Sequence, residues 1–130
     1  MISKWNALFM LVAVLFFSGA WAGRLEEGMA AYERRDYDTA LKTLGRLASE
    51  GDAVAQFFLG GMYSDGQGVP QDYVLAHMWF NIAAANGDVN YRVLASKDRD
   101  MLADTMTRKQ IAQAQDMARD CLAKNYKGCY

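Results

Sequence analysis

Residues 51–88 read GDAVAQFFLGGMYSDGQGVPQDYVLAHMWFNIAAANGD, and this stretch decides the fold. Two apolar segments with helical spacing lie on either side of a Gly- and Pro-containing break at residues 66–70. Asp52 and Asp72 precede the two segments, and Asp caps the free N–H groups at the start of a helix. The sequence therefore predicts one helix from Asp52 to near Ser64 and a second from Asp72 to Asn86, with Gly87 as its C-cap.

The same signals extend in both directions along the chain. We expect helices over residues 24–35, from Asp36 to before Gly51, and from Asp88 to near Met106. A sixth helix begins at Thr107, where Thr107 and Gln110 have the spacing of a capping box. The chain has one Pro and no run of β-branched residues, so the predicted fold class is all-α.

An internal repeat organises these helices. At an offset of 36 residues, Asp36-Tyr37 aligns with Asp72-Tyr73 and Gly51-Asp52 aligns with Gly87-Asp88. Each repeat is a pair of helices, and stacking about three pairs buries a continuous core. We predict a right-handed α/α solenoid whose first helices line a groove. Its units are a degenerate one at about 28–51, the clearest at about 52–87 and a closing pair at about 88–124.

The central unit resembles the Sel-1-like repeat, a relative of the tetratricopeptide repeat. A Leu-Gly pair, a Tyr, a Gly-x-Gly-Val-x-x-Asp turn and spaced Ala and Trp residues carry the resemblance. These positions are Leu59, Gly60, Tyr63, Gly66, Gly68, Val69, Asp72, Ala76, Trp79, Ala83, Ala84 and Gly87. The resemblance implies a solenoid that acts as a scaffold, adaptor or regulator through protein contacts, and exported bacterial members are associated with the cell envelope.

The signature residues also have a structural interpretation. Ala76, Trp79 and Ala83 fall three and four apart, so we expect them on one helix face, with the indole filling space beside the small residues. The Gly60-Gly61 pair is expected to allow a neighbouring helix to approach closely. The motif residues therefore build the fold and are poor candidates for a binding surface.

The first 22 residues have the layout of a secretory signal peptide. Lys4 is followed by an apolar run over residues 7–17, and Ala20-Trp21-Ala22 places small residues where a signal peptidase reads them. We expect cleavage between Ala22 and Gly23, a repeat domain over residues 23–130, and a protein in the periplasm or secreted. The alternative is an uncleaved anchor, since a span needs about 20 apolar residues. Only in that case would the protein attach to the membrane.

Charge and cysteine content narrow the class of protein. Cleavage removes Lys4 from the 14 basic residues, so 13 basic residues face 15 acidic ones and the net charge is −2. No clustered basic surface for nucleic acid is expected. Cys121 and Cys129 are predicted to form a disulfide in an oxidising compartment. A continuous helix would hold them about 12 Å apart, so the helix must end between them.

The sequence offers little for catalysis. His77 is the only histidine, which leaves too few ligands for a zinc site. No Ser has Lys three residues later, as serine β-lactamases require. We therefore predict no enzyme, no metal and no cofactor, and a module that binds a protein or peptide in the groove, with Gln56 as a candidate groove residue. The alternatives are an envelope hydrolase acting on peptidoglycan or β-lactams, and a purely structural fragment.

Mass spectrometry of the exported protein tests the N-terminal and cysteine predictions together. We expect the mass of residues 23–130 less two hydrogens, because cleavage follows Ala22 and the two cysteines are oxidised. A mass that includes residues 1–22 would contradict cleavage. A gain of two hydrogens is expected only after reduction.

Overall fold

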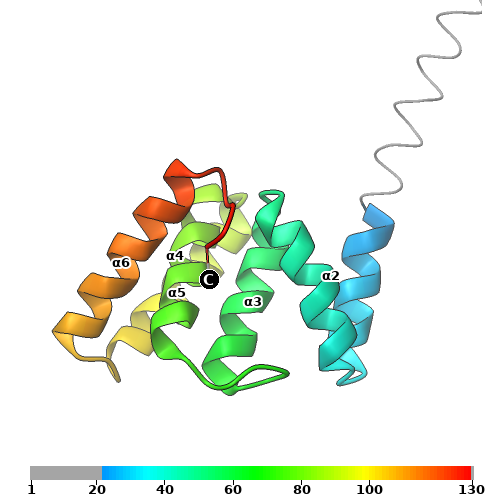
Figure 1. Ribbon diagram of the computed structural model, residues 1–130, viewed down its shortest axis with the longest axis horizontal. Coiled ribbons are helices and arrows are strands. Elements are labelled where there is room, and N and C mark those ends of the chain that lie inside the picture. Colours follow the sequence, from blue (N-terminus) through cyan, green and yellow to red (C-terminus); the bar gives the residue numbers. More distant parts are fainter. Residues whose placement is uncertain (1–21, 130) are drawn as a thin grey trace, which may run out of the picture.

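The computed structural model describes residues 22–129 and shows helices without strands in that part of the chain (Figure 1). Residues 22–33 are helical. The labelled helices that follow are α2 (Tyr37–Ser49), α3 (Ala53–Asp65), α4 (Tyr73–Asn86), α5 (Val89–Ala103) and α6 (Arg108–Ala123). They lie side by side in one array, and the all-α repeat architecture predicted from the sequence is confirmed.

The helix starts are set by the expected caps. Asp36, Asp52, Asp72 and Asp88 each accept a hydrogen bond from a backbone N–H in the first turn of the helix that follows. Thr107 and Gln110 form the reciprocal capping box of α6. An N-cap of this kind contributes about 1 kcal/mol, so local sequence alone fixes where each of these helices begins.

Helix α4 is the centre of the structure. It packs against α3, α5 and α6, and nearly every residue from Ala76 to Ala84 is buried. Trp79 is fully enclosed in the main core with Leu44 and Leu59. A helix that is apolar all round is stable only when neighbours cover every side, and α4 is covered by its three neighbours.

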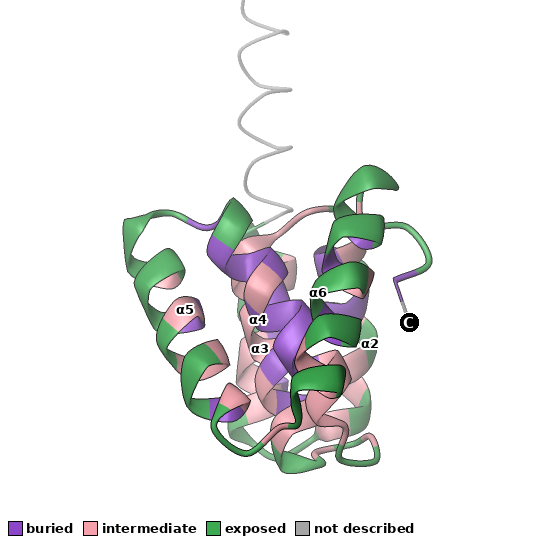
Figure 2. Ribbon diagram, turned by 90° about the vertical axis from the view of Figure 1, so that its left-hand side faces the viewer, coloured by how far each residue is buried: buried purple, intermediate pink, exposed green. Residues whose placement is uncertain are grey.

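The third unit differs from a close-packed hairpin. Both α5 and α6 pack on α4, but they hardly contact each other. Figure 2 shows them apart, with the buried α4 between them. The closing pair is therefore joined through the central helix, and α5 keeps a large part of its surface exposed.

The predicted end of α5 needs correction, whereas the predicted C-cap of α4 is confirmed. Helix α5 ends at Ala103 instead of near Met106, because the Thr105 hydroxyl and N–H both bond to the Leu102 carbonyl and turn the chain. Gly87 is the C-cap of α4, but its φ of −74° is extended, not left-handed. A side chain there would meet the Ala83 carbonyl oxygen at 2.9 Å, so close packing explains this glycine.

The turn between α3 and α4 contacts the first unit. Gly66 and Gly68 both have positive φ, a backbone conformation that glycine adopts readily. A Cβ on Gly68 would lie 2.8 Å from Cβ of Tyr37, and Gln67 donates a hydrogen bond to the Tyr37 hydroxyl. The long turn therefore fixes the second unit against α2.

The C-terminal segment folds back from α6 over the middle of the molecule (Figure 1). Cys121 and Cys129 form the expected disulfide. Helix α6 ends before the second cysteine, and Asn125, Tyr126 and Gly128 take positive φ values in the turn.

This segment also reaches the turn between α2 and α3. The Tyr126 ring lies 3.0 Å from where a Cβ on Gly51 would be, and Lys127 donates a hydrogen bond to the Ser49 carbonyl at 3.0 Å. Tyr126 thus packs on Gly51, and the loop that the disulfide closes on α6 contacts the first unit.

None of the helices described between residues 22 and 129 is long and apolar enough to cross a bilayer. The predicted signal segment lies outside the described residues except for Ala22. Cleavage between Ala22 and Gly23, export and the periplasmic or secreted location therefore stay predictions.

Reduction of the disulfide should weaken the whole fold. Opening the Cys121–Cys129 loop is expected to lower the free energy of unfolding by about 2–3 kcal/mol. Urea unfolding followed by helical circular dichroism, with and without dithiothreitol, measures this. The C121S/C129S double variant should match the reduced protein and be insensitive to dithiothreitol. Equal midpoints for oxidised and reduced protein would contradict a stabilising role.

Candidate protein-binding face

The first helices of the three units carry a row of aromatic side chains. We define the aromatic row as Tyr32, Phe58, Phe57 and Tyr91. The ring centroids of Tyr32 and Phe58 are 5.2 Å apart, those of Phe58 and Phe57 are 5.9 Å apart, and those of Phe57 and Tyr91 are 5.6 Å apart. All three contacts are edge-on, the geometry that aromatic quadrupoles favour. The row links the helix over residues 22–33 with α3 and α5.

The aromatic row is only partly buried. All four of its side chains keep part of their surface accessible. Burial raises the pKa of the Tyr32 phenol above its usual value, and the negative charge of Asp65 raises it further. Tyr32 is therefore a neutral phenol at neutral pH, and the Asp65 carboxylate interacts electrostatically with this end of the aromatic row.

A pocket of about 290 Å³ lies between α3 and α5, and Phe80 in its lining contacts Phe57 of the aromatic row, with ring centroids 5.7 Å apart. Gly61 and Asp65 line it from α3, Asp98 and Met101 line it from α5, and Phe80 of α4 also contributes. We call the surface made of the aromatic row and this pocket the first-helix face. It lies along the first helices, where the sequence predicted a groove, and its use by a partner stays a prediction.

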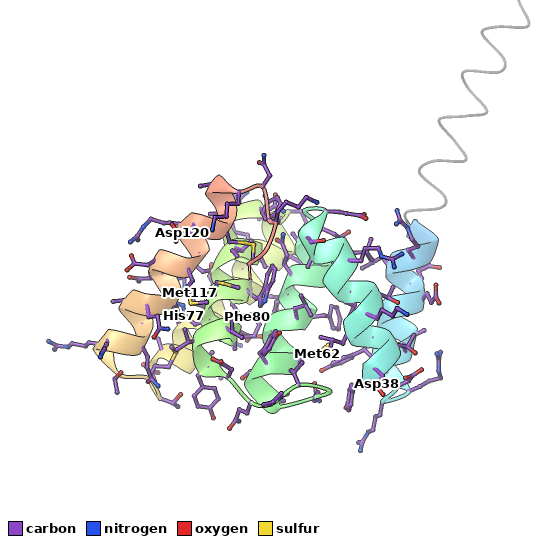
Figure 3. All side chains as sticks on the ribbon, in the orientation of Figure 1. Asp38, Met62, His77, Phe80, Met117 and Asp120 are labelled. Atoms are coloured by element: carbon purple, nitrogen blue, oxygen red, sulfur yellow. A yellow bond between two sulfur atoms is a disulfide. The ribbon has the colours of Figure 1, made fainter. Side chains whose placement is uncertain are left out.

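The two neighbouring glycines of α3 have different roles. A Cβ on Gly60 would lie 2.6 Å from the Phe80 ring, which lies between α4 and α3 in Figure 3, so Gly60 permits close packing as predicted. A Cβ on Gly61 would meet nothing within 4 Å. The expectation of close approach was therefore wrong for Gly61, which instead leaves the wall of the pocket open.

The prediction that Gln56 is an exposed groove residue was also wrong. Gln56 is 0% exposed, and its amide donates a hydrogen bond to the Ala48 carbonyl at 3.1 Å. Asn86 donates to the Gln56 side-chain oxygen. The buried amide connects α2, α3 and α4, and a polar side chain with such partners is stable inside the core.

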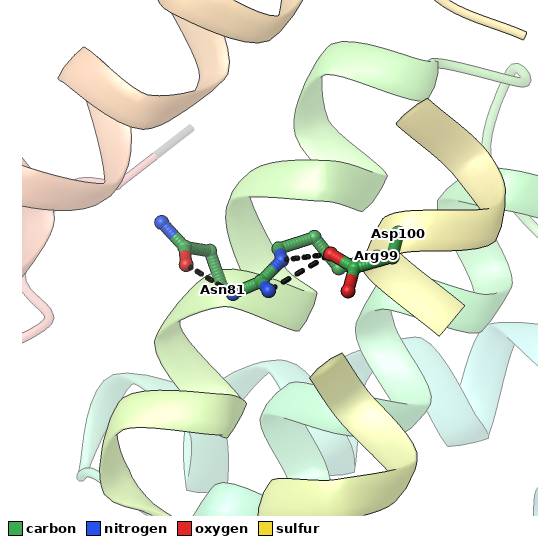
Figure 4. Close-up of polar contacts among 3 residues, drawn as sticks. All are labelled: Asn81, Arg99 and Asp100. Atoms are coloured by element: carbon green, nitrogen blue, oxygen red, sulfur yellow. Dashed lines mark hydrogen bonds and ion pairs between the residues drawn. The ribbon is translucent and has the colours of Figure 1, made fainter. Parts of the chain in front are cut away.

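His77 lies inside the fold and outside the first-helix face. It is 3% exposed, and its Nδ1 has no hydrogen-bond partner within residues 22–129. Burial lowers the pKa of the imidazole, and Arg99 lowers it further while Asp100 opposes this. Arg99 itself is held by Asn81 of α4 and Asp100, as Figure 4 shows. His77 is not among the residues that line the pocket between α3 and α5.

Most of the signature residues lie inside the packing. Leu59, Gly60, Ala76, Trp79, Ala83, Ala84 and Gly87 are buried, and Tyr63 and Val69 pack against the core. Ala76, Trp79 and Ala83 do not share one contact surface, however. Ala76 packs near Leu102 and Ala83 near Ala95, whereas Trp79 belongs to the main core. The reason is that α4 packs against helices on several sides, so residues three and four apart along it contact different neighbours.

Sequence reasoning missed the contribution of α5 to the face. Leu94 is 45% exposed and Met101 is 60% exposed. With Asp98 they fall at steps of four and three, which places all three on one stripe. That stripe was readable from the sequence, but only the position of α5 beside α3 shows which way it points. Among the described residues, no cluster of His, Cys, Asp and Glu side chains could hold a metal ion.

The two glycines of α3 provide a matched pair of stability predictions. Gly60→Ala should lower the free energy of unfolding by about 1–3 kcal/mol, because the new methyl group overlaps the buried Phe80 ring. Gly61→Ala should raise it by about 0.5–1 kcal/mol, because Ala favours the helix and the site is open. Urea unfolding of both variants measures the difference. Equal destabilisation by both would contradict the open wall at Gly61.

Comparison with known proteins agrees with this architecture. The family model of the Sel1 repeat matches residues 53–88, which comprise α3, the turn and α4. Neither the curated proteins nor the solved structures contain a match to the chain. Residues 53–88, the central helical pair that carries the core, thus match the Sel1 repeat.

Proposed function

We propose that this protein is a non-catalytic binding module of the bacterial cell envelope that holds a protein or peptide partner on its first-helix face. Sel1 repeats generally mediate protein–protein interaction. The observation that carries the proposal is the partly exposed aromatic row beside an open pocket, on the face that the sequence predicted as the groove.

The chemistry of the face supports a macromolecular partner. Tyr, Phe and Met are enriched in protein interfaces, and the face presents Tyr32, Tyr91 and Met101. Aromatic rings that already contact one another lose little freedom when a partner covers them, so less ordering entropy opposes binding. The face is therefore preorganised for an extended surface contact.

The size of the pocket favours a side chain of a partner over a free ligand. Its volume of about 290 Å³ is at the lower limit for small-molecule sites, which usually measure about 300–1,000 Å³. A single large side chain fits such a space. The partner is thus expected to anchor one residue in the pocket while the rest of its chain follows the aromatic row.

The envelope location rests on the N-terminal sequence and the disulfide. The signal-peptide pattern predicts export, and disulfides persist in the oxidising periplasm or outside the cell. The Cys121–Cys129 bridge joins the C-terminal segment to α6, and Lys127 of that segment donates a hydrogen bond to the Ser49 carbonyl of the first unit. A protein stabilised in this way is suited to an oxidising compartment.

Filling the pocket should abolish binding without damaging the fold. Peptides selected from a random display library on the purified protein serve as the probe. Gly61→Leu should weaken their binding at least 10-fold, because the leucine side chain takes the place of the partner's anchor while its Cβ meets open space. Fluorescence polarisation of the labelled peptides measures affinity, and urea unfolding checks the fold.

Ala112→Leu is the matched control, since it adds the same side chain at an exposed position of α6. It should leave peptide affinity within about twofold of the unmodified protein. Selected peptides that bind the Gly61→Leu variant as tightly as the unmodified protein would contradict a site on the first-helix face.

A further inference from the structure

The pocket between α3 and α5 is acidic. Asp65 and Asp98 line it from the two helices, and no Lys or Arg side chain is among its lining residues. Neither carboxylate forms an ion pair or hydrogen bond with another residue of the described range 22–129. By contrast, Asp36, Asp52, Asp72 and Asp88 are occupied as helix caps. Both carboxylates of the pocket therefore remain available to a partner.

The ends of the two helices add to the negative potential. Asp65 is the last residue of α3, and Met101 and Leu102 belong to the last turn of α5. The C-terminal end of a helix carries a partial negative charge that favours cations. Several end carbonyls are already bonded, such as that of Leu102 to Thr105. The carboxylates hence make the larger contribution.

Phe80, Met101 and Leu102 supply the apolar part of the pocket lining. The ring of Phe80 and the side chain of Leu102 are buried, whereas Met101 in the lining and Leu94 next to it on the α5 stripe expose large apolar areas. Asp98 lies between Leu94 and Met101 on the same stripe of that helix. The pocket thus combines apolar side chains in its wall with two carboxylates near the surface.

Lys and Arg side chains match this combination. Each has an apolar stem that packs along apolar surface and a cationic head that remains at the polar rim. An acidic side chain would be repelled, and a neutral apolar one would leave both carboxylates unpaired. Charge complementarity therefore favours a cationic side chain of the partner in this pocket over an acidic or a neutral one.

We propose that the pocket receives a Lys or Arg side chain of a protein partner, with an apolar residue beside it contacting Met101 and Leu94. This inference rests on the proposed function, because it names the chemistry of the partner at the same face. The cationic head pairs with Asp65 and Asp98, and the stem lies over Phe80.

A second pocket gives an internal comparison. It has about 360 Å³ and is lined by Arg24, Lys42 and Arg46, with Glu27 as its one acidic side chain. It lies between the helix over residues 22–33 and α2, so it belongs to the first unit. A cationic anchor would be repelled there, and the choice between the two pockets is decided by charge.

The test begins with a random dodecapeptide library displayed against the purified, disulfide-bonded protein. We expect the selected sequences to be enriched in Lys or Arg next to Leu, Met or Phe. The tightest peptide is then synthesised with citrulline replacing Arg, or norleucine replacing Lys, to remove the charge. Its affinity should fall about 10-fold, and the D65N/D98N double variant should lose about the same factor toward the charged peptide.

Two measurements separate charge recognition from a general loss of fold. The D65N/D98N variant should bind the uncharged peptide as well as the unmodified protein does, since no charge pair is left to lose. D116N is the matched control, because Asp116 is an exposed acid of α6 outside the pocket. It should leave the affinity for the charged peptide unchanged.

The outcomes distinguish this inference from the proposed function. Peptides without cationic enrichment that Gly61→Leu nevertheless excludes would overturn the cationic anchor and leave the binding face intact. Peptides that bind the Gly61→Leu variant and the unmodified protein with equal affinity would overturn both the cationic anchor and the proposed binding face. A charged peptide whose affinity is equal for the unmodified protein and D65N/D98N would also overturn the anchor.

Discussion

The burial of α4 on all sides is the constraint on which the rest of the structure depends. Trp79, Met78 and Ile82 point into the main core, while Ala76 and Ala83 pack toward α5. Exposing such a helix would place a large apolar area in water, at about 25 cal/mol for each Å². An isolated α3–α4 pair would leave part of α4 exposed. The matched repeat therefore needs the flanking helices in order to fold.

The arrangement of α5 and α6 follows from that need. Each covers a different side of α4, which separates them from one another. Helix α6 then gains further support from the Cys121–Cys129 bridge and from Tyr126 on Gly51. Helix α5 has no comparable support on its outer side, and most of the large exposed apolar residues of the described chain belong to it. The same packing that completes the core thus creates the apolar part of the first-helix face.

Local features of the fold could be predicted from the sequence because they depend on neighbours along the chain. The Asp caps, the Thr107–Gln110 box and the positive φ of Gly66 and Gly68 all belong to this class. The disulfide was also predictable, since two cysteines in a predicted exported chain leave one pairing. Such features fix where helices begin and where the chain turns.

Features set by packing between helices could not be predicted in the same way. Gln56 has a polar side chain, and only the nearby Ala48 carbonyl explains why it is buried. Gly60 and Gly61 are adjacent and identical, yet one faces the Phe80 ring and the other faces open space. The separation of α5 from α6 likewise depends on the shape of α4. The candidate site lies where these non-local contacts meet, so the sequence indicated the face but not its residues.

The location of the candidate site relative to the matched repeat bears on how partner choice is encoded. Within residues 53–88, the central pair provides Phe57, Phe58 and the open wall at Gly61. Tyr32 comes from the unit before it, whereas Tyr91 and Asp98 come from the unit after it. Since the residues of the matched repeat are mostly engaged in the core, they can vary little without loss of packing. Under the proposed function, the flanking helices contribute the aromatic ends and one of the two carboxylates at partly exposed positions, where a substitution would change the surface offered to a partner.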